Sequence, residues 1–369
     1  MGRQLQVERT MDEALFYLLK CIVNSESVSP SFMGGLTSDD WQLLFDLSKK
    51  QGVSAVVFDK IQSLPKEVAP PRNILIGWYS QALYVEQQLK KMFSLSAEYA
   101  DKMYENGIPV VVLKGLAFGV YYPNPMTREC GDLDCYMMGK GKEGDCITAV
   151  IGGKVEDGGY KHAHLHYKGL TIENHYYLTN FNNTKRGVYT ERYLQQLIDG
   201  GHRQLANTHL LSPSADFNAF FLIKHALMHF ISEGINLRHL LDWAFFLQNE
   251  QGSVDWESLL PEMEKCRIIR FAQVMTEMCV EKFGLEVAVE AIRIPADDRR
   301  GHSLMQQVLT DVMKGHSSLH KENFAQKCVR IARRFGRMWR YRTLASENYW
   351  LMVWNTFSFS SYLKRKVKL

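Results

Sequence analysis

The sequence lacks the long apolar runs and the leader that mark membrane and secreted proteins. No run approaches the roughly 20 consecutive apolar residues that span a bilayer, and the start MGRQLQVERT has no apolar stretch of a secretory signal. The seven cysteines are odd in number and lack C-x-x-C spacing, so we expect reduced, mostly buried thiols. These absences favour a cytoplasmic protein.

Internal repeats and low-complexity linkers are also absent, so the units of the chain are expected to pack together instead of moving independently on flexible linkers. The 369 residues exceed the usual length of one domain. Of these residues, 46% are hydrophobic and 23% are charged, a balance typical of globular proteins. We therefore expect two or three packed units that share one extended core.

Apolar spacing divides the chain into three regions. Residues 1–106 and 181–369 show helical spacing, and residues 107–180 contain short runs typical of strands. Strands are expected at 108–113, 132–138, 160–167 and 170–177, the last two as a hairpin about Lys168 and Gly169. The predicted fold class is α+β, in which a small mixed β-sheet core at 107–180 is flanked by N-terminal and C-terminal helical regions.

Two acidic residues, Asp132 and Asp134, open the second expected strand. Because side chains alternate along a strand, both carboxylates point to one face, about 6–7 Å apart. Glu173 lies on a later strand and offers a third carboxylate to the same edge. Three carboxylates suit a two-metal centre for phosphoryl transfer. We expect these residues to be catalytic and to hold Mg²⁺, with Mn²⁺ as an alternative ion.

A phosphate-binding segment is expected upstream of these acids. Gly115 ends the first strand and precedes a short helix, so the backbone can approach an anion while the helix N-terminus presents free N–H groups. Lys114 adds a positive charge beside the phosphates. Arg128 offers a further charge to a triphosphate, or else an ion pair that fixes the turn at Glu129.

Three segments carry a family resemblance. LKG at 113–115, MTRECGDLD at 126–134 and IENH at 172–175 resemble the uncharacterised nucleotidyltransferase family within the DNA polymerase beta-like superfamily. The helical segments LIKHALMHF and LRHLLDWAFFL extend the resemblance, which covers roughly residues 105–250. Two departures from the usual pattern concern the segment that is expected to bind the phosphates. Lys-Gly replaces the usual Gly-Ser, and Asp132 follows Gly115 by 17 positions.

The resemblance implies a metal-dependent transfer of a nucleoside monophosphate from a nucleoside triphosphate, such as ATP, to an acceptor that the sequence does not identify. It implies that the nucleotide binds at Lys114, Gly115, Arg128 and Gly131. Many similar proteins are connected with surface polysaccharide production, which suggests a pathway without naming an acceptor.

Histidines surround the expected site. His162, His164 and His166 alternate on one strand, so they share a face and could in principle bind zinc. Without a cysteine or a placed acid, such a pattern is more typical of a surface that binds an acceptor or forms hydrogen bonds. His175, two residues after Glu173, is expected to support the site or bind the acceptor.

Two helices of the C-terminal region contribute further candidates. His225 and His229 lie one turn apart, but the Glu of H-E-x-x-H is absent, which argues against a zinc protease. Arg238 and Asp242 are four residues apart, a spacing that favours an ion pair within one helix. His225, Arg238 and Asp242 are expected to support the site or to hold a nucleobase or acceptor against it.

The C-terminal end is basic. Residues 321–369 contain twelve Lys or Arg but only two acids, whereas the whole chain has a net charge of only +4. Arginines interleave with aromatic residues in RRFGRMWRYR, so this tail could bind an anionic polymer, including nucleic acid, or an anionic membrane surface. The alternative is that its aromatic residues pack on the helical region and its arginines are solvated.

Two other functions compete with nucleotidyl transfer. A nucleotide-sugar glycosyltransferase also uses D-x-D, but that class predicts a larger α/β sheet without about a hundred helical residues before the first strand. A non-catalytic nucleotide-binding module would keep the fold without turnover. Three intact acids argue against it.

Overall fold

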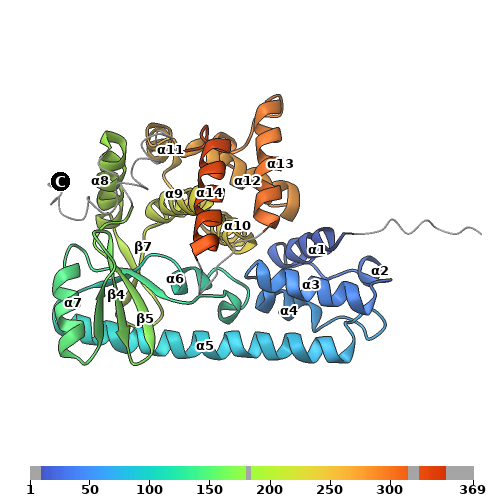
Figure 1. Ribbon diagram of the computed structural model, residues 1–369, viewed down its shortest axis with the longest axis horizontal. Helices are drawn as coiled ribbons and strands as arrows, with labels where there is room; N and C mark the ends of the chain where they lie inside the picture. Colours follow the sequence, from blue (N-terminus) through green and yellow to red (C-terminus); the bar gives the residue numbers. More distant parts are fainter. Residues whose placement is uncertain (1–9, 180–183, 315–323, 346–369) are drawn as a thin grey trace, which may run out of the picture.

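The structure, a computed structural model, describes residues 10–179, 184–314 and 324–345 of the chain. No helix in these segments is long and apolar enough to cross a membrane. A mixed β-sheet lies at one end of the molecule, and helices from the two ends of the chain pack beside and above it (Figure 1). This arrangement confirms the α+β class with helical flanks.

The N-terminal helices form one end of the molecule, and the longest of them reaches the sheet. The helix α5 (Arg72–Glu105) runs along the whole length of the body and passes beneath the strands (Figure 1). It begins directly after Pro70 and Pro71, a position where proline is tolerated because the first N–H groups of a helix have no partner. The other helices here are α1 (Met11–Val23), α2 (Pro30–Met33), α3 (Ser38–Lys50) and α4 (Ser54–Ile61).

Seven strands form the sheet, in the order β3-β4-β5-β2-β1-β7-β6. β2 pairs with β5 and β1 with β7 in parallel, and the other pairs are antiparallel, so the sheet is mixed as predicted. The strands are β1 (Val110–Val112), β2 (Leu133–Tyr136), β3 (Lys154–Asp157), β4 (His162–Tyr167), β5 (Leu170–His175), β6 (His202–Gln204) and β7 (Leu210–Pro213).

The expected hairpin is confirmed. β4 and β5 pair antiparallel from His162 opposite His175 to Tyr167 opposite Leu170. Lys168 and Gly169 both have positive φ, 50° and 89°, as a two-residue turn of type I′ requires. The turn fixes the register, and the register decides which side chains of the two strands meet.

Three strands were not expected. β3 has four exposed residues and a charged sequence, and β6 and β7 are only three and four residues long, within a stretch whose neighbours are helical. Such short segments lack a usable period. Their pairing partners supply the reason for the extended conformation, since β7 lies beside the buried strand β1. The sheet thus draws two strands from the chain beyond residue 180.

Helices of the C-terminal part pack beside and above the sheet (Figure 1). One hydrophobic core runs without a break from the N-terminal helices through the strands to α9, α10 and α12. The four buried cysteines Cys21, Cys135, Cys266 and Cys279 are free thiols, as predicted, whereas Cys146 is exposed. Two helices, α6 (Leu116–Gly119) and α7 (Gly141–Val150), lie between strands of the central region. The helices of the C-terminal part are α8 (Lys185–Asp199), α9 (Ala215–Ser232), α10 (Leu237–Glu250), α11 (Trp256–Lys265), α12 (Ile269–Phe283), α13 (Arg299–Met313) and α14 (Phe324–Arg340).

Candidate functional site

The candidate site forms where β2 and β5 lie side by side. These strands are parallel, with Asp134 opposite Glu173 and Tyr136 opposite His175. Paired residues point to the same face, so Asp134, Glu173 and His175 converge. One ligand atom from each lies within 4.8 Å of the others, a spacing at which the three could hold a metal ion.

Histidine joins the two acids. Nε2 of His175 lies 3.2 Å from Oδ1 of Asp134 and 3.6 Å from Oε2 of Glu173. The hydrogen bond from His175 lowers the pKa of Glu173. For Asp134, burial alone would raise the pKa, but Lys114 and His175 hold it well below its ordinary value. Both carboxylates are therefore ionised at neutral pH, as metal ligands must be.

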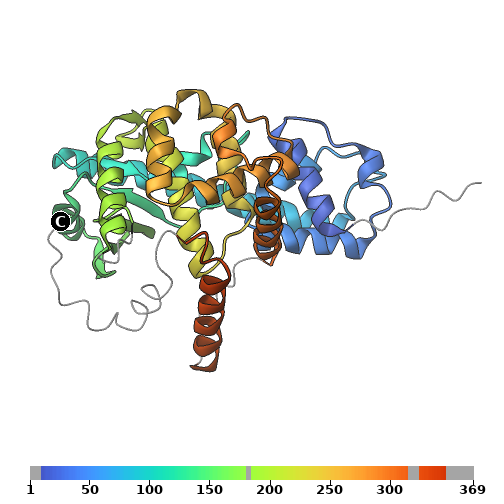
Figure 2. The same ribbon diagram turned by 90° about the horizontal axis from the view of Figure 1, so that it is seen from above.

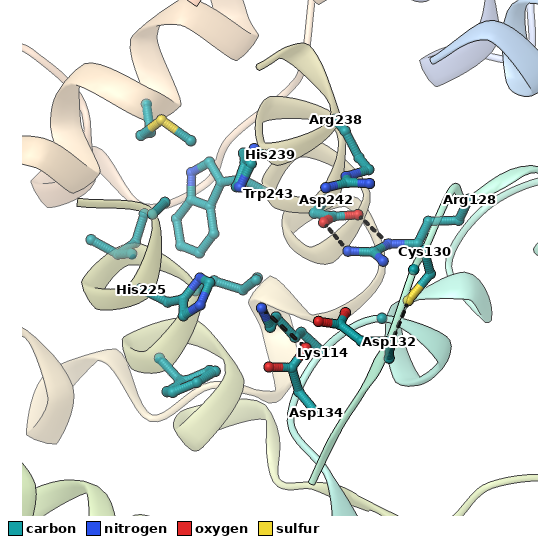
Figure 3. A pocket seen from close by; sticks show the side chains of 17 residues that line it. Lys114, Arg128, Cys130, Asp132, Asp134, His225, Arg238, His239, Asp242 and Trp243 are labelled. Atoms are coloured by element: carbon teal, nitrogen blue, oxygen red, sulfur yellow. Dashed lines mark hydrogen bonds and ion pairs between the residues drawn. The ribbon is translucent and has the colours of Figure 1, made fainter. Parts of the chain in front are cut away.

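Asp132 lies next to this group and is not one of its three members. Its carboxylate faces the same cavity as Asp134 and Lys114 (Figure 3). Burial and the negative charge of Asp134 raise the pKa of Asp132 to about 6. Two carboxylates that lie two residues apart, one just before β2 and one within it, thus have opposite pKa shifts, because Asp134 has partners that stabilise its charge whereas Asp132 lies beside a like charge.

Lys114 makes its closest ion pair with an acid of the site. Its Nζ lies 3.0 Å from Oδ2 of Asp134. Burial disfavours the ammonium form, but the nearby charges of Asp134 and Asp132 outweigh burial and raise the pKa of Lys114. The side chain remains 24% exposed, so the charge borders the cavity and is not sealed in the core.

Gly115 occupies a backbone conformation that other residues rarely adopt. Its φ is 63° and its ψ is −115°, and a Cβ atom there would lie 2.8 Å from Sγ of Cys130. This conformation carries the chain from β1 into the single-turn helix α6. Gly131 also lines the cavity, but a Cβ atom there would meet nothing within 4 Å.

Arg128 is anchored to a distant helix. Its guanidinium forms a bidentate ion pair with the carboxylate of Asp242 on α10. The distances are 3.1 Å from Nε to Oδ1 and 2.6 Å from Nη2 to Oδ2. The hydroxyl of Tyr122 donates a third hydrogen bond to Asp242. All three side chains are buried. This anchor ties the segment before Asp132 to the C-terminal helices (Figure 3).

Two ion pairs expected from the sequence are therefore absent from the described residues. Asp242 pairs with Arg128 and not with Arg238, and Arg238 donates instead to the backbone carbonyl of Glu129 at 2.8 Å. Arg128 does not pair with the carboxylate of Glu129, which accepts backbone N–H groups at the start of α4. In both cases the real partner comes from a distant part of the chain.

The histidines of α9 and α10 border the cavity from the other side. His225 and His239 line it together with Trp243. Burial lowers the pKa of both imidazoles well below the ordinary value, and the positive charge of Lys114 adds to the effect on His225. Nε2 of His225 lies 3.1 Å from Nε2 of His229. The rings of His225 and His239 are therefore neutral at pH 7 and give this side of the cavity a polar, uncharged lining.

The three histidines of β4 divide into two groups. His162 lies opposite His175 and His164 opposite Glu173, whereas His166 lies opposite Thr171. Burial lowers the pKa of His162 to about 4. Contrary to the expectation from sequence, an acid is placed beside this row, because Glu173 approaches His164 across the hairpin.

Lys161 is a residue that sequence reasoning missed. The charges of Lys114, Asp134 and Glu173 all act on it, and burial together with Lys114 lowers its pKa. In the described segments its side chain forms no hydrogen bond or ion pair. No sequence signal marks it, since these three charges come from separate segments of the chain, namely the turn after β1, β2 and β5.

A groove continues from the cavity along α5. It has a volume of about 680 Å³ and runs between α5, the segment 129–131 and the β4–β5 turn. Cys130, Gly131 and Arg238 line both the groove and the cavity, so the two are continuous. Thr171 lines the groove and lies on the face of β5 that carries Glu173. The groove thus reaches the segment that precedes Asp132 and the start of β5, the strand that carries Glu173.

The described part of the site has the chemistry of a centre for a metal and an anion. Carboxylates lie on one side, and Lys114, Arg238 and a glycine turn before a helix lie on the other. A family model described as "Uncharacterised nucleotidyltransferase" matches residues 37–284. The match includes every candidate site residue named above. No curated protein and no solved structure matches the chain.

Proposed function

Because the chain belongs to the uncharacterised nucleotidyltransferase family, we propose that it transfers a nucleoside monophosphate from a nucleoside triphosphate to an acceptor hydroxyl. One observation carries the proposal. Asp134, Glu173 and His175 converge on the cavity edge where Lys114 and the Gly115 turn lie. Carboxylates for a metal and cations for phosphates are the two requirements of this reaction.

The proposed step exchanges one phosphorus–oxygen bond for another. The oxygen of the acceptor hydroxyl attacks the α-phosphorus of the triphosphate and forms a new P–O bond. The bond from the α-phosphorus to the oxygen that leads to the β-phosphorus breaks, and pyrophosphate leaves with that electron pair. The hydroxyl proton passes to the carboxylate of Glu173, which is ionised because its pKa is lowered.

The donor set fits a divalent ion of the Mg²⁺ or Mn²⁺ type. Asp134 and Glu173 supply oxygens, and Asp132 borders the same space and would complete a two-metal site. When bound, the metal would neutralise the triphosphate and favour the ionised acceptor oxygen. His175 holds the two carboxylates in place through its Nε2 atom.

We assign the triphosphate to the cavity side of the acids. Lys114, Gly115 and Gly131 are the proposed contacts, together with the backbone N–H of Leu116 at the start of α6. Arg128 lines the same cavity, but its guanidinium already forms a bidentate ion pair with Asp242. We therefore propose that Arg128 positions the segment before Asp132. Arg238, which makes one hydrogen bond to a backbone carbonyl, has N–H groups left for a phosphate.

We assign the acceptor to the groove along α5. Its rim carries Gln81, Gln88 and Tyr84 from one face of the helix and Thr171 from β5. The amides of Gln81 and Gln88 and the hydroxyl of Thr171 form no hydrogen bond with other described residues, so they remain available to a ligand. Lys91, Glu129 and Arg238 also line the groove, but the amides and hydroxyls of its rim favour an acceptor with several hydroxyl groups, in keeping with a role in polysaccharide production. His164 and His166 would border its end.

A second candidate role concerns the basic end of the chain, and α14 is the observation that favours it. This helix projects from the body (Figure 2), and Val329, Ile331 and Trp339 on it are exposed alongside several arginines. We propose that it approaches an anionic surface, a membrane or a polymer. Met338 and Tyr341 are buried, so its C-terminal end packs on the helices as the alternative expected. Residues 346–369 lie outside the described residues.

The direct test is to find the product. The protein is incubated with each labelled nucleoside triphosphate, Mg²⁺ and cell extract, and the molecule that gains a nucleoside monophosphate is identified by mass. Asp132→Asn and Glu173→Gln serve as inactive controls. Transfer that is undiminished in both variants would contradict the proposal and favour a nucleotide-binding module.

The groove assignment has its own test. Once an acceptor is known, Gln88→Ala should raise the KM for that acceptor and leave the KM for the triphosphate unchanged. Gln87→Ala is the matched control, because Gln87 is exposed on the same helix but does not line the groove. Equal effects of the two substitutions would remove the groove from the proposal.

A further inference from the structure

A second group of ligand atoms lies on the solvent side of Glu173. His162 and His164 extend from β4 on the face that carries Glu173, and one ligand atom from each of the three residues lies within 4.8 Å of the others. The rings of His162 and His164 are 4.7 Å apart between centroids. This group differs from the Asp134–Glu173–His175 group in its donors, because nitrogen supplies two of its three ligand atoms.

The two oxygens of Glu173 face different histidines. Oε2 lies 3.6 Å from Nε2 of His175, and Oε1 lies 3.9 Å from Nδ1 of His164. One carboxylate therefore has an oxygen for each group. Carboxylates that link two ions in this way are a common feature of sites with metals about 3.5–4 Å apart.

Nδ1 of His162 is an independent sign of a missing ligand. This atom is buried and forms no hydrogen bond in the described part of the protein. A buried polar atom without a partner is costly, and a metal ion is one way to satisfy it. The side chain of His164 is 40% exposed, so an ion can enter from solvent and keep a water molecule on its open side.

We propose that His162, His164 and Glu173 form a second metal site, which binds a transition ion such as Zn²⁺ beside the site proposed for Mg²⁺. Imidazole suits Zn²⁺ and its neighbours, whereas Mg²⁺ prefers oxygen. Bonds of about 2 Å need ligand atoms about 3–3.5 Å apart, which small rotations of these partly exposed side chains supply. Binding of this ion does not depend on nucleotidyl transfer.

His166 provides a matched control. It lies on the same strand and the same face, but it pairs with Thr171 and is not a member of the group. Its removal takes away one imidazole two residues from His164 without touching the proposed ligands. A merely adventitious uptake by surface histidines would not distinguish the two positions.

The test uses the full chain, stripped with chelator and kept in excess Mg²⁺. Zn²⁺ affinity is measured by competition with a chromophoric chelator, and Co²⁺ is used as a visible probe of coordination. Wild type and His166→Ala should bind one ion per chain and show the same Co²⁺ absorption bands. His162→Ala and His164→Ala should weaken binding by more than about 10-fold and lose these bands. Equal affinity of His164→Ala and wild type would overturn the proposal, as would equal losses in His164→Ala and His166→Ala.

Variants of the acids separate this site from the proposed function. Asp132→Asn should keep the Co²⁺ bands, whereas Glu173→Gln should lose them. If nucleotidyl transfer is never found but this pattern holds, the second site stands and the proposed function fails. If His164→Ala melts below the assay temperature, His164→Gln is substituted. Bands that persist in Glu173→Gln contradict the site whatever the histidine variants do.

Discussion

Two ion pairs of this protein have different surroundings. The pair between Arg128 and Asp242 is closed, since both side chains are buried, the guanidinium binds as a fork and Tyr122 supplies a further hydrogen bond. The pair between Lys114 and Asp134 is open, because Lys114 borders a cavity and Asp134 shares its charge with His175 and lies near Asp132. We infer that the first pair holds the fold and the second serves the chemistry.

The largest effect should come from the group of Asp134, Glu173 and His175, which shares Asp134 with the open ion pair. Glu173→Gln keeps the shape of the side chain but removes the charge, so nucleotidyl transfer should fall by about 10²–10⁴-fold. Triphosphate affinity should change little, because the acceptor side and not the triphosphate side is altered. Single-turnover kinetics and calorimetry measure the two effects. A loss of triphosphate affinity as large as the loss of rate would contradict the assignment of Glu173 to the acceptor.

Arg128→Met should lower the free energy of unfolding. The substitution leaves the buried carboxylate of Asp242 without its main partner, which costs about 3–5 kcal/mol of unfolding free energy. Urea unfolding measures this change. Arg128→Met combined with Asp242→Leu should recover much of the loss, since two apolar residues replace the pair. Full stability in the single variant would show that the pair is not the anchor described above.

Asp132 and Asp134 should respond to pH in opposite ways in the metal-free protein. The pKa of Asp132 is raised to about 6, so its contribution to stability is present at pH below about 4 and is lost as pH rises through 6. Asp132→Asn should therefore exceed wild type by up to about 3 kcal/mol at pH 7, and this advantage should vanish on acidification.

For Asp134 the sign is reversed. Its pKa is lowered by Lys114 and His175, although burial opposes them, so the ionised form stabilises the fold above the ordinary pKa of an aspartate. Asp134→Asn should be less stable than wild type at pH 7, and the difference should shrink as the pH falls below about 4. Melting curves of the metal-free protein from about pH 2 to about pH 8 check both variants. If both variants were more stable than wild type at pH 7, or both less stable, the opposite pKa shifts of Asp132 and Asp134 would be contradicted.

The smallest expected effect is that of Lys114→Ala. The variant loses one charged hydrogen-bond donor, worth about 1.5–3 kcal/mol in triphosphate affinity, or roughly 10-fold or more. Calorimetry in Mg²⁺ measures the change. Lys265→Ala is the control, because Lys265 pairs with Glu262 at the surface and does not line the cavity. Equal affinity of wild type and Lys114→Ala would remove Lys114 from the nucleotide site.

Much of the candidate site could be predicted because it rests on local periods. D-x-D at the start of a strand places two acids on one face whatever the rest of the fold does. The turn at Lys168 and Gly169 sets the register of β4 and β5, which brings Glu173 level with His164. In the structure His175 joins Asp134 and Glu173 in one group and Asp132 lies beside it, so the catalytic roles of the three acids stay predictions.

Motifs and apolar periods of two or 3.6 residues were enough to predict the family and the α+β class, because both signals are local in the chain. Which charged side chains meet depended on the packing of distant segments. Arg128 binds a carboxylate 114 residues away, and the spacing of Arg238 and Asp242 on one helix carried no information about that contact. The strands β6 and β7 and the charged surroundings of Lys161 also depend on contacts between distant segments. A helix repeat or a strand repeat is a property of the local backbone, whereas a buried ion pair or an edge strand exists only when distant segments have packed together.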